Sequence, residues 1–330
     1  MFDKQFSSKV YSMHKMLFAV LIFACAGNIH GATQAPTATA PLRVFAVPGQ
    51  NGLGSGSDDV ALNLNQGNTS SITAVATPTF PRIDLGQSCC VSHLAGASAK
   101  VKHDASLIHA TSQGTATALR YAGSDSRVKG LVLESVMASG NSAIQHTVRE
   151  TVAPAIANLP LSYYWLPYVT KVLYPLYWPA GQQGIKSVEN IPTTTPVVIV
   201  HSTRDFQLSH KDACAVYYRL RERGVPAYLI SPDDSRHVDT IRAKERAAVQ
   251  EILGSHGLIP GRPSGSADLS RYQPDHRPYK QFYQDLIAKE RNHTILAYST
   301  AMAVASGLAY KYREPLKRFA KYLATKIRLA

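Results

Sequence analysis

Short apolar runs alternate with stretches of helical character through the middle of the chain. Six runs have the length and the β-branched content of buried strands; they cover residues 42–47, 71–76, 105–110, 128–133, 196–201 and 227–230. Helical stretches lie between or after them, the clearest at 88–101, 211–223 and 242–253. This alternation predicts an α/β fold with a mainly parallel, doubly wound sheet that is covered by helices on both faces.

Active-site residues in such sheets lie at the carboxyl ends of the strands, so the residues that follow each strand are the candidates. Ser112 follows the third run within Ala-Thr-Ser-Gln-Gly, Asp205 follows the fifth and His237 follows the sixth. A serine hydroxyl is a weak nucleophile at neutral pH, and it needs a base and a group that orients the base. Ser112, His237 and Asp205 are therefore candidates for nucleophile, base and acid. Glu134 ends another strand and is a second candidate acid, although a hydrogen bond to backbone is the preferred interpretation.

These segments together resemble the α/β-hydrolase family, in which the catalytic residues follow the order Ser, Asp, His along the chain. The resemblance spans residues 42–254 and is carried by VPGQNGLG, IHATSQG, PVVIVHSTRD and SRHVD. It implies that two backbone N–H groups bind the oxyanion, one from Gln113 and one from Gln50, with Asn51 as the alternative to Gln50. Ala110, Pro48, Ser202 and Arg236 replace residues that are common in the family, and none of these changes removes a catalytic atom.

An insertion separates the strand that ends at Glu134 from the strand that begins near Pro196. It is too long for a simple crossover, so we expect a helical cap over about 138–190 within a hydrolase domain of residues 42–256. The cap is rich in Tyr and Trp, and Trp165 and Tyr168 are our candidates for an apolar substrate pocket. The alternative is that these rings fill the core of the cap itself.

The C-terminal part is foreign to the basic fold. Residues 257–275 indicate a linker, and residues 276–330 indicate a basic extension with three helical segments. The middle segment, residues 294–310, carries no charge and predicts a helix docked on the protein. The second interpretation is association of residues 294–330 with a membrane, as a span or a surface anchor.

The N-terminus has the features of a secretory signal, with basic residues before an apolar run that starts at Met16. We expect a signal peptide at 1–26 and a flexible lead-in at 27–41, and hence export to the periplasm or the medium. A lipoprotein signal that uses Cys25 is a weaker alternative.

Composition narrows the choice of function. The chain has 330 residues, of which 45% are hydrophobic and 17% are charged, so it can bury a full core. The net charge of +13 lies mainly at the two ends, with seven basic residues against one acidic residue in 311–330. The body is only mildly basic, which gives nucleic-acid binding little support. The four cysteines have no metal-ligand spacing.

The predicted function is therefore an exported serine hydrolase that cleaves a carboxylic ester through an acyl-enzyme, with amide and peptide bonds as the second choice. The substrate is a small-molecule or lipid ester, and neither a metal nor an organic cofactor is expected. The alternative is an inactive protein of the same fold that binds a partner or a membrane surface.

Overall fold

The computed structural model describes residues 43–47, 74–76, 87–100, 104–173, 184–234, 236–237, 241, 243–259, 268–311 and 313–314. All of these residues belong to one compact unit, residues 40–330. The expected signal peptide, the lead-in, Gln50, Asn51 and the last helical segment of the extension lie outside the described residues.

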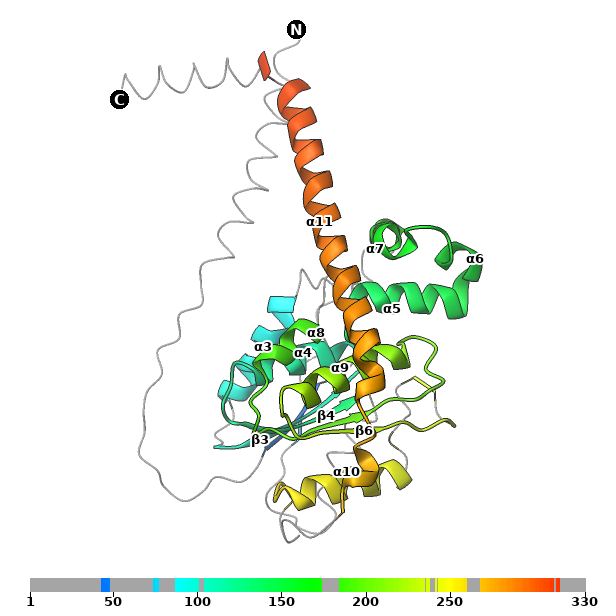
Figure 1. Ribbon diagram of the computed structural model, residues 1–330. Coiled ribbons are helices and arrows are strands. Elements are labelled where there is room, and N and C mark those ends of the chain that lie inside the picture. The colour runs from blue at the N-terminus through cyan, green and yellow to red at the C-terminus, as the bar shows by residue number, and fades with distance from the viewer. Residues whose placement is uncertain are drawn as a thin grey trace, which may run out of the picture. The chain divides into compact units, whose positions relative to one another are not determined.

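A six-stranded sheet forms the centre of the unit (Figure 1). Its strands are β1 (Arg43–Val47), β2 (Ala74–Ala76), β3 (Ser106–Thr111), β4 (Val128–Glu134), β5 (Val197–Val200) and β6 (Ala227–Ile230). The order across the sheet is β2-β1-β3-β4-β5-β6, and every neighbouring pair is parallel. The predicted α/β fold with a parallel sheet is thus confirmed.

Helices cover both faces, because the strands are apolar on both sides. Helices α3 (Gln87–Lys100), α4 (Gln113–Ala122) and α9 (His210–Glu222) contribute to one core layer, and α10 (Ala243–Ser255) packs in the other. Successive residues of β4 alternate between the layers, with Leu131 and Leu133 on the first side and Val132 on the second. This period of two is what a strand imposes on its side chains.

The register brings the carboxyl ends of four strands to one edge of the sheet. Thr111 of β3 pairs with Glu134 of β4, Glu134 pairs with Val200 of β5, and Val200 pairs with Ile230 of β6. The residues that follow Thr111, Val200 and Ile230 therefore leave the sheet side by side, although they are distant in the sequence.

The insertion after β4 is helical, as expected. It comprises α5 (Gly140–Thr147), a π-helical turn η2 (Val148–Val152), α6 (Pro154–Ala157), α7 (Ser162–Leu173), α8 (Gly184–Ser187) and a 3-10 turn η3 (Val188–Asn190). Figure 1 shows α5 and α7 beside the long helix α11, with α6 on the side of α7 that faces away from α11. In contrast, α8 packs on α4, where Gly184 allows the backbone to approach Met137 and Ala116.

The C-terminal part differs from the prediction. The first two of the three expected helical segments form one continuous helix, α11 (Lys280–Lys311), which follows the 3-10 turns η4 (Ser270–Tyr272) and η5 (Arg277–Tyr279). No proline or capping glycine separates the two segments, and the hydroxyl of Thr294 donates to the carbonyl of Glu290 one turn earlier. The expected linker is also partly ordered, since Tyr272 donates a hydrogen bond to Glu251 of α10 at 2.8 Å.

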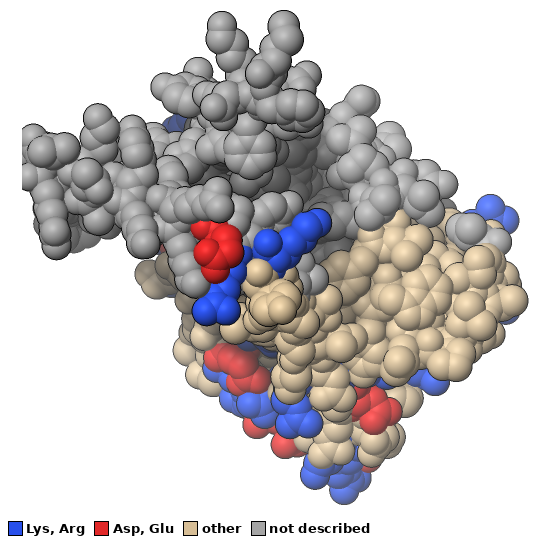
Figure 2. All heavy atoms as spheres, turned by 90° about the horizontal axis from the view of Figure 1, so that it is seen from above, with Lys and Arg blue, Asp and Glu red and all other residues tan. Residues whose placement is uncertain are grey.

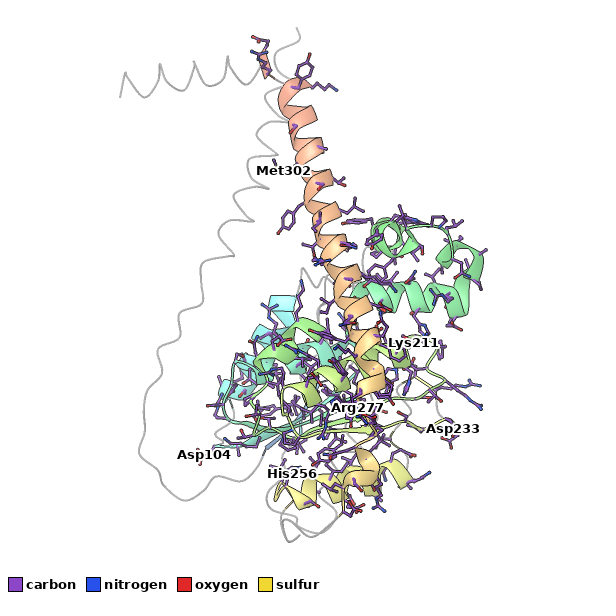
Figure 3. All side chains as sticks on the ribbon, viewed as in Figure 1. Asp104, Lys211, Asp233, His256, Arg277 and Met302 are labelled. Atoms are coloured by element: carbon purple, nitrogen blue, oxygen red, sulfur yellow. The ribbon has the colours of Figure 1, made fainter. Side chains whose placement is uncertain are left out.

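The first half of α11 packs on α9 and buries Leu286, whereas the described side chains beyond Thr294 are exposed. Tyr298 is 71% exposed, Met302 66% and Tyr310 82%. The expectation that residues 294–310 dock on the protein is therefore wrong for these side chains, because no described element reaches that far along the helix (Figure 3). Among the helices in the described ranges, none combines the length and the apolar character that a membrane span requires.

Candidate active site

Ser112 occupies a strained turn between β3 and α4. Its backbone has φ 52° and ψ −122°, a conformation that residues other than glycine rarely adopt. The backbone N–H of Ser112 donates to the carbonyl of Glu134 at 2.9 Å, and its own carbonyl accepts from the N–H of Thr115 at 3.0 Å. The Ser112 hydroxyl does not cap α4. The turn thus places the hydroxyl at the edge of the sheet.

The structure brings Ser112, His237 and Asp205 together. The Nε2 atom of His237 lies 3.1 Å from Oγ of Ser112, and its Nδ1 lies 2.9 Å from Oδ2 of Asp205. An ionised carboxylate can only accept, so Nδ1 carries the proton and Nε2 is left to accept from the serine hydroxyl. The imidazole therefore bridges the hydroxyl and the carboxylate, which is the arrangement of a Ser-His-Asp triad.

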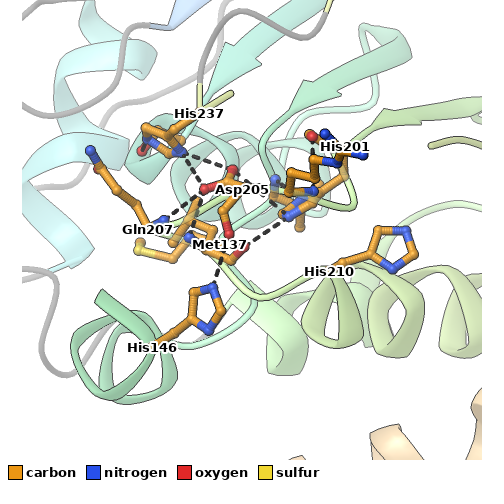
Figure 4. A network of polar contacts seen from close by, with 12 residues as sticks. Met137, His146, His201, Asp205, Gln207, His210 and His237 are labelled. Carbon is orange, nitrogen blue, oxygen red and sulfur yellow. Dashed lines mark hydrogen bonds and ion pairs between the residues drawn. The ribbon is translucent and has the colours of Figure 1, made fainter. Parts of the chain in front are cut away.

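The carboxylate of Asp205 is held in place from several sides (Figure 4). Besides His237, its Oδ1 accepts the backbone N–H groups of Gln207 at 2.8 Å and Leu208 at 2.9 Å. Burial alone would raise the pKa of Asp205, but the hydrogen bond from His237 and the neighbouring imidazoles outweigh it and lower the pKa. Asp205 is consequently ionised at neutral pH, as a group that stabilises an imidazolium must be.

His201 is hydrogen-bonded to the loop that carries Asp205, and its imidazole is neutral. The backbone N–H of Val136 donates to its Nδ1 at 2.9 Å, so the proton sits on Nε2, which donates to the carbonyl of Leu208 at 3.1 Å. Complete burial lowers the pKa of His201 to about 4. Both ring nitrogens of His201 are thus occupied by backbone groups, which gives it a structural role.

The insertion also holds the loop of Asp205 through hydrogen bonds that the sequence did not indicate. His146 of α5 donates from Nε2 to the carbonyl of Asp205 at 2.9 Å, and the hydroxyl of Thr147 donates to the carbonyl of Gln207 at 3.1 Å. Both residues lie at the C-terminal end of one helix, whose apolar periodicity gives no sign of a contact with a loop 60 residues away. Only the three-dimensional arrangement reveals the link.

Two further residues flank the imidazole. Phe206 lies edge-on to His237 with ring centroids 6.3 Å apart, and 38% of its surface is exposed. Glu134, at the end of β4, accepts the backbone N–H of Ile241 at 3.3 Å and so tethers the segment that follows His237. This contact is the hydrogen bond to backbone that the sequence analysis preferred for Glu134.

The remaining predicted site residues are placed as follows. Gln113 is the first residue of α4 and is buried, directly after Ser112. The indole of Trp165 donates to the carbonyl of Pro160 at 3.2 Å, and Tyr168 stacks on His293 of α11 with centroids 5.4 Å apart. These contacts lie within the insertion and between the insertion and α11, and Tyr168 is 46% exposed. In the part of the chain that the structure describes, no His, Cys, Asp and Glu side chains are grouped as metal ligands would be.

Comparisons with known proteins found similarity to solved structures only. No family model and no curated protein matches the chain. Among solved structures, an esterase of Pyrococcus furiosus matches with 15% identity and a TM-score of 0.48 over 65% of this chain and 80% of that chain. A monoacylglycerol lipase of Paleococcus ferrophilus matches with 15% identity and a TM-score of 0.43 over 66% of this chain and 96% of that chain. Est1E of Butyrivibrio proteoclasticus matches with 16% identity and a TM-score of 0.44, over 66% and 88%.

The fold follows from the features of the chain itself. Strands β1 to β6 are parallel, a strained strand-turn-helix holds a serine at the end of β3, and an aspartate and a histidine follow β5 and β6 in that order. This combination defines a recognised architecture. The chain has the α/β-hydrolase fold.

Proposed function

We propose that the protein is a serine hydrolase that cleaves carboxylic esters. The observation that carries the proposal is the contact of His237 with both Ser112, at 3.1 Å, and Asp205, at 2.9 Å. Each of these residues follows a different strand, and the serine is held in a strained backbone conformation of the kind that clusters at active sites.

In the proposed reaction, Oγ of Ser112 attacks the ester carbonyl while Nε2 of His237 accepts its proton. Asp205 stabilises the resulting imidazolium through Nδ1. His237 then returns the proton to the leaving alcohol, and water releases the acyl group from Ser112. We propose the backbone N–H of Gln113 as one oxyanion donor, since it opens α4 where the positive end of the helix dipole stabilises an anion. Gln50 remains the predicted second donor.

In this proposal the exposed ring of Phe206, which flanks the imidazole, contacts the substrate. An apolar ring beside the nucleophile favours acyl or aryl groups. Trp165 and Tyr168 remain predictions for the distal part of such a pocket.

A fluorophosphonate probe tests the nucleophile, because only an activated serine reacts with it quickly. We expect the wild type to be labelled and Ser112→Ala not to be labelled, with hydrolysis of p-nitrophenyl esters reduced about 10³-fold or more. Ser126→Ala, an exposed serine outside the site, is the matched control. Equal labelling of Ser112→Ala and the control would remove Ser112 from the reaction. A wild type that is neither labelled nor active would favour the inactive binding protein instead.

We also propose export through a signal peptide at residues 1–26, with the basic residues of 311–330 near anionic lipid. N-terminal sequencing of the mature chain tests the first part, since an intact Met1 would contradict it. Extraction without detergent tests the second part: protein that is fully released by low-salt buffer does not associate with membranes.

A further inference from the structure

A second cavity lies outside the contacts of the triad. It has a volume of about 230 Å³ and opens between α5, the start of α9 and the first half of α11. Figure 3 shows Lys211, from the first turn of α9, close to the place where α5 and α11 approach each other. Ser112 and His237 are not among its lining residues. The proposed function therefore leaves this cavity unexplained.

Three cationic side chains converge on the cavity, each from a different element. They are Arg149 from η2, Lys211 from α9 and Lys289 from α11. Within the described residues, none of the three forms an ion pair with a carboxylate. Figure 2 shows one face of the molecule, where basic and acidic side chains both reach the surface.

The aromatic rings next to two of these cations restrict their positions. Lys211 lies 5.5 Å from the ring centroid of Phe282, and Lys289 lies 5.5 Å from that of Tyr163. A cation over a ring face is attracted to it, which limits the rotamers of a long side chain. Phe282 itself lines the cavity, so its contact with Lys211 holds that ammonium group there and reduces the entropy it would lose when an anion binds.

The two carboxylates in the wall do not cancel this charge. Asp285 accepts a hydrogen bond from Gln281 at 2.7 Å, one turn away on α11. Burial raises the pKa of Asp212 to about 6, and its hydrogen bond with Ser142 opposes the shift only in part. Counted formally, the three cations and these two carboxylates leave one excess positive charge at the cavity.

We propose that this cavity binds a phosphate group. Arg and Lys side chains are the usual protein ligands of phosphate, and three different helical elements supply them to this cavity. Ser209 adds a hydroxyl, since its side chain lines the cavity and makes no capping hydrogen bond to α9. The volume is below the 300–1,000 Å³ of pockets for whole drug-sized ligands, so it fits a head group rather than a complete large molecule.

The phosphate can belong to a small soluble molecule or to a lipid head group, and the experiment separates these sources. The full chain is titrated with inorganic phosphate by calorimetry in a phosphate-free buffer. In parallel, it is sedimented with phosphatidylcholine vesicles that do or do not contain phosphatidic acid. The test variant is Arg149→Gln/Lys211→Gln. The control is Lys129→Gln/Lys186→Gln, which removes the same charge from exposed positions outside the cavity.

Saturable 1:1 binding of inorganic phosphate by the wild type and the control, at least about 10-fold weaker in the test variant, supports a soluble source. Binding confined to phosphatidic acid vesicles, with the same loss in the test variant, supports a lipid source. Equal binding by all three proteins, or no binding of either probe at about 10 mM phosphate, overturns the proposal. If circular dichroism shows that the test variant is unfolded, Lys289→Gln against Lys186→Gln makes the same comparison. Fluorophosphonate labelling of the same samples reports on the proposed function separately.

Discussion

The carboxylate of Glu290 is the clearest target for a stability measurement. Glu290 lies on α11 and is 0% exposed. It accepts hydrogen bonds from the hydroxyls of Ser139 and Tyr163 and from the amide of Asn141. Burial and the Glu290 carboxylate raise the pKa of Tyr163, so this hydroxyl keeps its proton and donates.

The expected effect of Glu290→Ala follows from these contacts. The substitution leaves three buried donors without their acceptor, and each unsatisfied donor costs about 1–3 kcal/mol. Removing the carboxylate also removes the cost of keeping it out of water, which offsets part of the loss. The net destabilisation should therefore be about 2–4 kcal/mol. Glu290→Gln keeps one acceptor oxygen and should lose less.

Urea unfolding followed by circular dichroism measures this loss as a change in the free energy of unfolding. Glu150→Ala is the matched control because Glu150 is exposed on η2, and it should change stability by less than about 0.5 kcal/mol. A loss below about 1 kcal/mol for Glu290→Ala would show that α11 is not held by these hydrogen bonds.

Three further substitutions test separate parts of the structure. Ser112→Gly should raise the melting temperature while abolishing probe labelling, because glycine relieves about 1–3 kcal/mol of strain at φ 52°; an unchanged or lower melting temperature would contradict the strain. Asp212→Asn should flatten the dependence of stability on pH. The folded protein holds the Asp212 proton up to a pKa of about 6, so wild-type stability falls as pH rises from about 4 to 6, by up to about 3 kcal/mol. An equal change in the free energy of unfolding between about pH 4 and about pH 6 for wild type and Asp212→Asn would refute this. Gly184→Ala places a Cβ 2.6 Å from the carbonyl oxygen of Met137 and should lower stability by about 1–3 kcal/mol, measured against Gly96→Ala, where nothing lies within 4 Å.

The local part of the fold could be predicted because each strand is buried on both faces. An apolar run such as 128–133 needs no knowledge of its neighbours to be recognised, and β4 begins at the predicted residue. The meeting of Ser112, Asp205 and His237 could be expected for a related reason. Parallel strands in register end at one edge, so residues just beyond β3, β5 and β6 lie close together whatever the intervening sequence contains.

The contacts of the C-terminal helix could not be predicted in this way. In the sequence, Glu290 has the pattern of an exposed charged residue on a polar helix. Nothing within α11 indicates that it contacts Ser139, Asn141 and Tyr163. Its burial depends on three elements that pack together only in the folded chain. The exposure of Met302 could not be predicted either. An uncharged stretch suggests a buried helix, but the sequence does not show whether another element lies against it.

The hydrogen bonds from His146 and Thr147 to the loop of Asp205 have a consequence for engineering. The helix that begins the insertion also fixes the height of the catalytic acid beneath the imidazole. Exchanging this insertion for another would therefore also move the loop that carries Asp205. Under the proposed function, such an exchange changes turnover together with substrate range, and a graft that keeps α5 through Thr147 separates the two.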